Sequence, residues 1–532
     1  MRLRIQQVNV PLRYDDSLVI REISRKLGCL PSLLASVKII RRSLDTRPRH
    51  PEPLYALLVE ATLNLPKLPI GAPRAGIELL PDAEPPPAAR PTVTRRDEPR
   101  PIVVGAGPAG LMAAYGLALA GARPILIERG EDAESRSPKA ARFWNDGILD
   151  PESNVLYGEG GAGLFSDGKL TARSKERNRV LEFMELLHAC GADDSVLIDS
   201  EPHVGSDALL RIVPRLRRRI EEAGGEVRFR SRLESLIIEA GRLRAVIVNG
   251  QEIACNRCVL AVGHSARDVY DSLAAAGVAL TAKPFAVGVR LELPQAAIDH
   301  ALYGKWAGNP LLGAAGFRLT RREEPGIRAC YSFCMCPGGK VIACASEPGF
   351  LTTNGMSYSR RLLNRGNAAF LVPVTAADYP EHPTPALAGV AFQRELERLA
   401  FDAAGGGYAL PAVRLVDFLA GRISQALPED GSCSRAVPAD LRLILPECVI
   451  YTLEKSIPPM LRELNGAPLE EAVLYAPETR SSSPLRIERD DGGESISTRG
   501  LYPAGEGAGY AGGIVSSAID GMRAAEQVLK SL

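Results

Sequence analysis

The chain has 532 residues and a mass of 57.0 kDa, a length that corresponds to about three domains of ~150 residues each. Its 64 Lys and Arg residues balance 63 Asp and Glu residues, and the formal net charge of +1 excludes a uniformly basic nucleic-acid coat protein or an acidic tail protein. Hydrophobic residues at 45% and charged residues at 24% exclude disorder along the whole chain.

The first ten residues, MRLRIQQVNV, contain no apolar run of the kind that a secretory signal needs. The uncharged stretch 101–122 is long enough to span a bilayer. It contains Gly-x-Gly-x-x-Gly, however, and we interpret it as strand, turn and helix. Ten cysteines in a chain without an export signal indicate reduced thiols. We therefore expect a cytoplasmic protein with no membrane span.

Residues 1–80 form a small α/β module of their own. An alternating pattern predicts a strand over residues 2–12, and a helical pattern follows over residues 17–27 after an acidic cap. Two more strands are predicted over residues 37–43 and 55–63.

A Pro-rich segment, residues 81–100, separates this module from the rest of the chain and is typical of an extended linker. The module has 13 Lys and Arg against 7 Asp and Glu, a net charge of +6, which leaves −5 for the remainder. Two interpretations stay open: the module docks on the remainder, which we favour, or it binds nucleic acid. Its basic cluster comprises Lys38, Arg41, Arg42, Arg47 and Arg49, with few aromatic neighbours for base stacking.

The strongest motif lies directly after the linker. An apolar run leads into Gly105-x-Gly107-x-x-Gly110, a helix of small residues follows, and a second apolar run ends at Glu128. In a dinucleotide fold, Gly105 permits a tight turn, Gly107 lets the backbone approach a pyrophosphate, and Gly110 lets helix and strand pack closely. Glu128 stands where a carboxylate accepts from a ribose hydroxyl. The pattern predicts a Rossmann-type nucleotide site.

Three later segments accompany this motif: the Gly-rich loop 157–173, the apolar run 259–263, and the Gly-rich segment 501–519 before a final helix. Together they resemble flavoproteins of the glutathione-reductase type. More closely, the chain resembles a poorly characterised family of FAD-dependent dehydrogenases with a small N-terminal domain. The stretches YSFCMCPGG (331–339), TNGMSYSRR (353–361) and ETRSSSPLRI (478–487) also carry this resemblance.

The resemblance implies FAD as the cofactor, with Glu506 on its ribityl chain and residues 512–514 near the pyrimidine edge of its ring system. A helix N-terminus there suits the negative charge of a reduced flavin. The predicted cofactor-binding residues are Gly105, Gly107, Pro108, Ala109, Gly110, Glu128, Arg129, Gly160, Gly161, Ser166, Asp167, Lys169, Gly263, Gly505, Glu506, Gly512, Gly513 and Ile514.

A second Gly-x-Gly-x-x-Gly occurs at residues 507–512, but only 20 residues follow it. That leaves no room for a second strand–helix–strand unit, so we predict no stable NAD(P)H domain. NAD(P)H remains an expected transient electron donor. The cysteine pair of the disulfide reductases is also missing, because residues 105–169 contain no Cys.

The catalytic candidates are Cys334, Cys336, His203 and Tyr358. A thiolate in the Cys-x-Cys-Pro-Gly-Gly turn would serve as a redox partner or a nucleophile, whereas small buried hydrophobes are the alternative. His203 lies beside the flavin or caps a turn, and His264 has the same alternatives. Tyr358 is a proton donor or a packed aromatic. We expect no metal site, and Cys255-x-x-Cys258 is interpreted as part of a strand.

Arg290 and Glu292, with Arg480 and Arg486, are the candidates for binding an anionic substrate, the three arginines as its direct contacts. The alternative is that these residues simply pair with acids on a strand face.

The sequence thus predicts an α/β fold: a Rossmann-type FAD-binding domain with an inserted mixed α+β substrate domain, preceded by the α/β module. The expected boundaries are 1–80 (module), 81–100 (linker), 101–279 (FAD, first part), 280–490 (substrate or cap) and 491–532 (FAD, C-terminal part). The predicted function is two-electron or hydride transfer through FAD on an unidentified small organic substrate. The alternatives are a flavoprotein acting on RNA through the module, and a binding protein with structural FAD.

Overall fold

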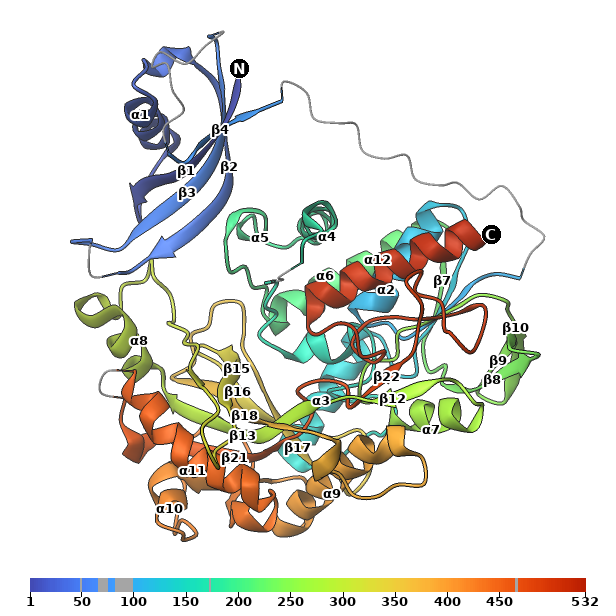
Figure 1. Ribbon diagram of the computed structural model, residues 1–532. Coiled ribbons are helices and arrows are strands. Elements are labelled where there is room, and N and C mark those ends of the chain that lie inside the picture. Colours follow the sequence, from blue (N-terminus) through green and yellow to red (C-terminus); the bar gives the residue numbers. More distant parts are fainter. Residues whose placement is uncertain (48–49, 66–74, 82–98, 172–173, 465–466) are drawn as a thin grey trace.

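The computed structural model describes residues 1–47, 50–65, 75–81, 99–171, 174–464 and 467–532. Figure 1 shows three groups of elements: a small module at the N-terminal end, a sheet flanked by helices that include α2 and α12, and a further sheet with its own helices. Most of the predicted linker, at positions 82–98, lies outside the described residues. The division into domains at the predicted boundaries stays a prediction.

The N-terminal module has the predicted order of strand, helix, strand and strand, followed by one more strand. Its elements are β1 (Arg2–Pro11), α1 (Asp16–Leu27), β2 (Leu34–Asp45), β3 (Leu54–Leu63) and β4 (Ile77–Leu80). The strands are antiparallel in the order β2-β3-β1-β4. Helix α1 begins where the Asp15 side chain accepts from the Leu18 N–H. Strand β4 was not predicted, because four residues are too few to show an alternation.

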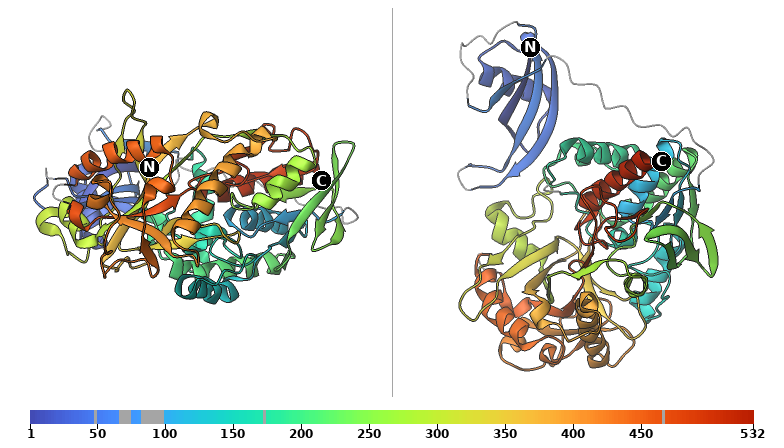
Figure 2. Two further views of the ribbon diagram at one scale, coloured as in Figure 1. Left: turned by 90° about the horizontal axis from the view of Figure 1, so that it is seen from below. Right: turned by 45° about the vertical axis from the view of Figure 1, so that its right-hand side comes forward.

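The module has a hydrophobic core of its own. Alternate residues of β1, among them Leu3 and Ile5, are fully buried against Val19 and Ile23 of α1. Figures 1 and 2 show the module beside the rest of the molecule, with one end of its sheet directed toward α5 and α8.

A parallel sheet is built from both ends of the chain after the linker, as predicted. Its strand order among the described residues is β23-β11-β5-β6-β7, and each neighbouring pair is parallel. The bounds are β5 (Ile102–Val104), β6 (Ile125–Ile127), β7 (Glu226–Arg228), β11 (Cys258–Leu260) and β23 (Leu501–Pro503). An antiparallel meander lies between β7 and β11: β8 (Leu233–Glu239), β9 (Arg242–Val248) and β10 (Gln251–Ala254).

Two helices pack side by side on this parallel sheet. These are α2 (Pro108–Leu119), which contacts β5, β6 and β11, and α12 (Ile514–Ser531), which contacts β11 and β23. A β-carbon at Gly521 of α12 would lie 2.0 Å from the carbonyl oxygen of Ala109 in α2. The two helices therefore cross tightly at the beginning of α2. The other helices of this half are α3 (Ala133–Asp146), α4 (Arg177–Ala189), α5 (Ser195–Ile198), α6 (Ser206–Glu222) and α7 (Arg267–Ala275).

The second large sheet comes from the region predicted as the substrate domain. Its order among the described residues is β14-β15-β18-β13-β21-β19-β20. The bounds are β13 (Phe285–Pro294), β14 (Thr320–Arg321), β15 (Cys330–Cys336), β18 (Arg365–Val374), β19 (Leu410–Arg414), β20 (Ala436–Pro438) and β21 (Val473–Glu478). The central strands β13 and β18 are buried almost throughout, because helices and a hairpin cover the sheet.

The other elements of this region, among the described residues, include four α-helices, a hairpin and a separate two-stranded pair. The helices are α8 (Gln295–Tyr303), α9 (Ala388–Ala403), α10 (Leu415–Leu419) and α11 (Glu447–Arg462). The hairpin is β16 (Lys340–Cys344) with β17 (Thr352–Met356), and a separate two-stranded pair is β12 (Leu280–Ala282) with β22 (Leu485–Ile487).

A buried ion cluster joins the two halves. Arg267 at the start of α7 donates to Glu397 of α9 at 2.6 and 2.9 Å, and Arg480 donates to the same carboxylate at 2.8 and 2.9 Å. Burial alone would raise the pKa of Glu397, but the two guanidinium groups hold it well below its usual range. Removing one partner of such a buried cluster leaves an uncompensated charge, so the halves are held together at this point.

None of the described helices is both long enough and apolar enough to cross a membrane.

Because the turn between β5 and α2 is tight, we expect one added methyl group at Gly110 to destabilise the protein. A β-carbon at Gly110 would lie 1.8 Å from the Gly105 carbonyl oxygen, so Gly110→Ala must displace the turn. We expect a loss of about 1–3 kcal/mol in the free energy of unfolding, as for other overpacked sites, measured by urea denaturation.

The matched control is Gly116→Ala in the same helix. Its β-carbon would meet only the Ala525 β-carbon, at 3.2 Å, and Ala has the better helix propensity by about 1 kcal/mol. Equal urea midpoints for the two variants would contradict the tight turn.

Candidate functional site

A cavity of about 1070 Å³ lies between the parallel sheet and the second sheet. One side is formed by the carboxyl ends of the parallel strands, with Val104 after β5, Ile127 after β6, Ala261 after β11 and Ala504 after β23. Ligands of open α/β sheets bind at this edge. The volume exceeds the roughly 300–1,000 Å³ of most small-ligand pockets, so the cavity has room for a large cofactor and a second molecule.

The start of helix α2 faces this cavity. Gly105 has a φ of +97°, and a β-carbon there would lie 2.4 Å from the Ala261 carbonyl oxygen. Helix α2 begins at Pro108, and its N-cap residue Gly107 has no side chain to accept from the first N–H groups. These donors and the helix dipole stay available to a phosphate group.

Glu128 is held in the cavity wall by three backbone donors. Its Oε2 accepts from the Ala106 N–H at 2.8 Å, and its Oε1 accepts from the Gly130 and Gly158 N–H groups at 2.9 and 3.0 Å. A carboxylate has about four acceptor positions. One position therefore remains for a ribose hydroxyl, and the carboxylate is fixed before any ligand arrives.

The Gly-rich loop after β6 closes over the same edge. The β-carbon position of Gly161 lies 3.2 Å from the Gly107 Cα, so the two backbones approach closely. Further along, Asp167 is almost fully buried and accepts from Arg361 Nε at 3.0 Å. Lys169 donates from Nζ to the Met335 carbonyl oxygen of β15. The loop thereby connects the nucleotide edge to the second sheet.

The wall near α12 carries little fixed negative charge at neutral pH. Burial raises the pKa of Glu506 to about 7, opposed in part by the Gly513 N–H and by Lys283. His264 Nε2 lies 3.7 Å from Glu506 Oε1. Burial, with Arg480 and Arg267, lowers the pKa of His264 to about 3, so this imidazole is neutral. The N-terminus of α12, which begins at Ile514, faces the cavity without a side-chain cap.

This set of groups fits FAD. Uncapped helix N–H groups suit a pyrophosphate, a fixed carboxylate suits a ribose, and the start of α12 suits a ring that gains negative charge. All but two of the predicted cofactor-binding residues line the cavity, including Gly107, Arg129, Gly263 and Gly512. Gly110 lies behind the turn, where it permits packing, and Gly160 donates to the Ala106 carbonyl oxygen. Their roles as ligands of FAD stay predictions.

Of the catalytic candidates, Cys334 lines the cavity. It lies in a bulge of β15 with a φ of +45°, and its carbonyl oxygen accepts from Arg290 at 3.2 Å and from Cys336 Sγ at 3.4 Å. The pKa of the Cys334 thiol falls to about 6 because Cys336 donates to it and because Arg290 and Lys169 are close, against the effect of burial.

The other three catalytic candidates do not line the cavity. Cys336 is fully buried, and both its hydrogen bond to Cys334 and burial raise its thiol pKa. His203 Nε2 lies 3.0 Å from the Ser359 carbonyl oxygen, and burial lowers its pKa. Tyr358 is 39% exposed, with Lys340 Nζ 5.9 Å from its ring. His203 therefore contacts the backbone of the segment that contains Ser359, and a catalytic role for these three residues stays a prediction.

The three arginines that are candidates for binding an anionic substrate lie in different surroundings, and that role stays a prediction. All five N–H groups of Arg290 donate to protein atoms: Glu478, Asn367, Asn354 and the Cys334 carbonyl oxygen. Arg486 lies over the Tyr510 ring, 5.4 Å from its centroid, away from the cavity. Arg480 does line the cavity, although Glu397 and Ser346 hold it. Arg290 thus pairs with a buried acid, as in the alternative interpretation. Glu292 is also buried, and it accepts hydrogen bonds from Tyr475 and Ser432.

Several residues that line the cavity belong to none of the cofactor-binding or catalytic motifs recognised in the sequence. On the side away from the nucleotide edge these are Arg42, Leu44, Thr46, Tyr55, Leu302, Tyr303, Leu312, Phe317, Arg318 and Phe333. They come from the N-terminal module, from α8 and from the segments around β14 and β15. Ordinary apolar and basic residues become a wall only through the tertiary fold, so no local pattern identifies them.

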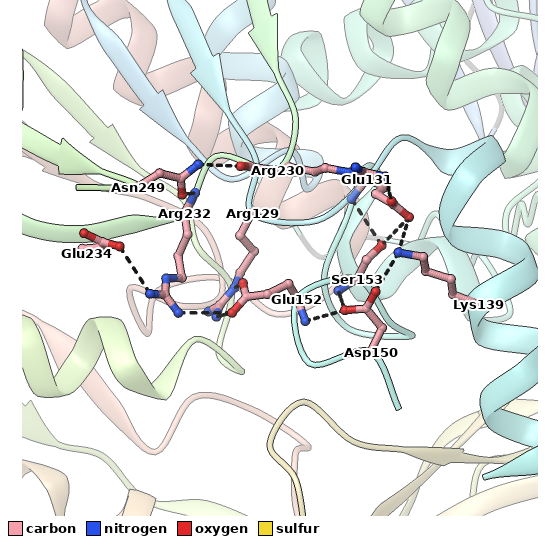
Figure 3. Close-up of a pocket in the computed structure, with 10 residues that line it drawn as sticks. All are labelled: Arg129, Glu131, Lys139, Asp150, Glu152, Ser153, Arg230, Arg232, Glu234 and Asn249. Atoms are coloured by element: carbon pink, nitrogen blue, oxygen red, sulfur yellow. Dashed lines mark hydrogen bonds and ion pairs between the residues drawn. The ribbon is translucent and has the colours of Figure 1, made fainter. Parts of the chain in front are cut away.

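A second cavity, of about 610 Å³, opens beside Arg129 (Figure 3). Its charged groups pair with one another: Glu152 with Arg129 and Arg232 at 3.0 and 3.2 Å, and Lys139 with Asp150 at 2.6 Å. This leaves little charge for a ligand. Within the described ranges no group of His, Cys, Asp or Glu is arranged to hold a metal ion. Cys255 and Cys258 are both buried, with Cys255 between β10 and β11 rather than within a strand.

Comparison with known proteins shows which family the chain resembles. Residues 100–263 match the domain family "FAD binding domain", and residues 284–481 match "FAD-dependent protein, C-terminal domain-like". An uncharacterised protein of Clostridium beijerinckii is 40% identical over 541 aligned positions, which cover 100% of this chain and 99% of that protein. Protein FixC of Escherichia coli K12 is 28% identical over 54% of this chain and 61% of its own length.

Solved structures give only weak similarities. Glycine oxidase from Geobacillus kaustophilus shares 14% identity over 81% of this chain and 94% of its own, with a TM-score of 0.34. A mutant of the halogenase PltM in complex with FAD shares 11% identity over 82% of this chain and 70% of its own, with a TM-score of 0.39. Values this low carry no weight in the assignment.

The cavity and the two matched domains define an FAD-dependent enzyme of the oxidoreductase class. More particularly, the chain belongs to the same family of FAD-dependent proteins as the Clostridium protein. The narrower resemblance to the glutathione-reductase type stays a prediction.

The three donors around Glu128 predict the effect of an isosteric change. In Glu128→Gln, the amide NH₂ must face at least one of the N–H groups that the carboxylate now accepts from. A buried donor left unpaired costs about 1–3 kcal/mol, and we expect FAD to dissociate about tenfold more readily. Equilibrium dialysis of FAD measures this.

The control is Glu429→Gln, at an exposed position, which should bind FAD like the wild type. Unchanged FAD affinity in Glu128→Gln would contradict the place assigned to this carboxylate.

Proposed function

We propose that this enzyme binds FAD along the carboxyl edge of the parallel sheet and transfers two electrons, as a hydride, to or from a small organic substrate. The observation that carries this proposal is the continuity of one cavity. It extends from Gly107 at the start of α2 to Phe333 and Cys334 on the second sheet. A cofactor held at the first end leaves the second end open to a substrate.

FAD supplies reversible two-electron transfer when it is bound. The residues of the chain bind and orient it. The α2 N-terminus and Glu128 would hold the pyrophosphate and a ribose, and the α12 N-terminus would stabilise negative charge on the ring. Glu506, with a pKa raised to about 7, is partly protonated at neutral pH and would donate as well as accept hydrogen bonds.

Cys334 is the catalytic candidate that the geometry favours. Cys334 lines the substrate end of the cavity, and neighbouring cations stabilise its thiolate. A thiolate is the reactive form of cysteine. It would act on the substrate as a nucleophile, or exchange electrons together with Cys336, whose Sγ donates to the Cys334 carbonyl oxygen.

A nicotinamide donor would have to use the same substrate end. Gly507, Gly509 and Gly512 lie in the loop between β23 and α12. We propose NAD(P)H as a transient donor rather than a resident cofactor. Action on RNA is not favoured, because Arg42 of the basic cluster pairs with Asp199 of the main body. Arg49 of that cluster lies outside the described residues.

An anaerobic titration of the FAD-loaded protein with NADH and with NADPH tests the proposal through the visible flavin spectrum. We expect bleaching by one of the two, or else by an organic substrate in a screen of small oxidisable compounds, followed by recovery of colour with an acceptor. A bound flavin that no organic reductant bleaches, while dithionite does, would contradict the proposal and support a structural cofactor.

We predict a characteristic pH dependence for the rate at which the Cys334 thiol is alkylated. Its pKa is lowered from 9.0 to about 6, so the thiolate forms as the pH rises through about 6 and is lost below that value. The rate at which iodoacetamide alkylates Cys334, followed by mass spectrometry of its peptide, should reach half its maximum near pH 6. Lys169→Met should move this midpoint upward, because it removes one of the cations.

Cys29 of the N-terminal module is an internal control in the same sample. Burial raises the pKa of its thiol above 9.0, so its alkylation should increase only in alkaline solution. A Cys334 profile that follows that of Cys29 would exclude a thiolate in the cavity.

A further inference from the structure

The N-terminal module touches the main body through the edge strand β2. Arg42 Nε donates to Asp199 Oδ1 at 2.6 Å, and the Ser200 N–H donates to the Arg42 carbonyl oxygen at 2.9 Å. Arg42 and Asp199 thus form a short parallel bridge between the sheet of the module and the segment after α5. Backbone and side chain both take part, so the contact fixes which residue of β2 meets the main body.

Aromatic residues of the module support this contact. The Arg42 guanidinium lies 4.9 Å from the centroid of the Tyr55 ring, and Tyr55 meets Tyr14 edge to face at 6.1 Å. Burial would lower the pKa of Arg42, but hydrogen bonding and attraction to Asp199 hold it above its usual range. Because both partners are largely shielded from water, with 24% and 30% of their side chains exposed, the pair orients the module.

Beyond this ion pair, the module supplies part of the cavity wall. Leu44, Thr46 and Tyr55 line the cavity together with Tyr303 of α8 and Phe333 of β15. Leu44 is 38% exposed and Phe333 is 45% exposed. Large apolar side chains left uncovered on facing walls are typical of a site that binds an apolar molecule.

The charges at this end of the cavity do not cancel. Arg42 pairs with Asp199, and Arg361 pairs with Asp167. Arg318, which lines the cavity and is exposed, has no partner among the described residues. Lys169 comes no closer than 3.9 Å to Asp167, which Arg361 already holds. Among the described residues that line this end, Glu201 is the one acid without an ion pair, so Arg318 and Lys169 outnumber it and attract an anionic group.

We propose that the N-terminal module forms the outer wall of the substrate site, and that this site takes an organic anion with an apolar, ring-sized body. The inference rests on the proposed function, because it locates the substrate of that function between the module and the second sheet. The apolar body lies against Leu44 and Phe333, and the anionic group lies near Arg318.

Calorimetric titration of the FAD-loaded full-length enzyme with 2-naphthoate tests both parts. Leu44→Asp places a carboxylate in the apolar wall and should weaken binding at least about tenfold. Arg318→Ala should weaken 2-naphthoate by a similar factor and leave the uncharged analogue naphthalene-2-methanol within about twofold. The control is Leu79→Asp, on the opposite edge strand β4 at a position 67% exposed, which should bind like the wild type.

A second measurement tests the wall without any bound ligand. Leu44→Trp fills the outer end of the cavity and should slow alkylation of Cys334 by iodoacetamide several-fold, whereas Leu79→Trp should leave that rate unchanged. An unchanged rate in Leu44→Trp would overturn the assignment of the module as a wall.

The outcomes distinguish a failure of this inference from a failure of the proposed function. Failure of the wild type to bind 2-naphthoate would overturn the ligand class, and equal binding by the Leu44→Asp and Leu79→Asp variants would overturn the wall. Both results leave the proposed function standing if the same FAD-loaded sample is bleached by an organic reductant. A sample that is never bleached would contradict the proposed function itself.

Discussion

The close approach of Gly110 to the carbonyl oxygen of Gly105, where a β-carbon would leave only 1.8 Å, is the contact on which the site depends. It brings α2 directly above β5, so the uncapped start of the helix points at the carboxyl edge of the parallel sheet. The equally tight contact of Gly521 with Ala109 brings α12 beside it. Two helix N-termini therefore face one cavity, which concentrates positive potential where an anionic cofactor binds.

Catalysis also needs a second surface opposite the cofactor site, where a substrate can bind. The buried cluster of Arg267, Glu397 and Arg480 holds the mixed sheet against the nucleotide-binding half, and Lys169 links the Gly-rich loop to β15. These polar contacts are buried and specific, so they fix the relative position of the two halves. Cys334 lines the cavity from a bulge in β15, where its φ is +45°.

The sequence was sufficient for the features that depend on local chemistry. Gly105 has a φ that few other residues adopt, and Glu128 and the start of α12 are recognisable from short sequence patterns. All three line one cavity. It was insufficient for Arg290 and His203, because their partners Glu478 and Ser359 lie 188 and 156 residues away along the chain. Leu44 and Tyr55 were missed for the same reason: a strand of a separate module lines the cavity only after it docks.

The decisive experiment is a crystal structure of the FAD complex, because it shows where the cofactor lies in the cavity that the two halves share. We expect the pyrophosphate at the start of α2 between Gly107 and Gly161, one ribose hydroxyl on Glu128, and the ring system between the start of α12 and Cys334. FAD bound outside this cavity, or with its ring system away from the second sheet, would exclude the proposed site.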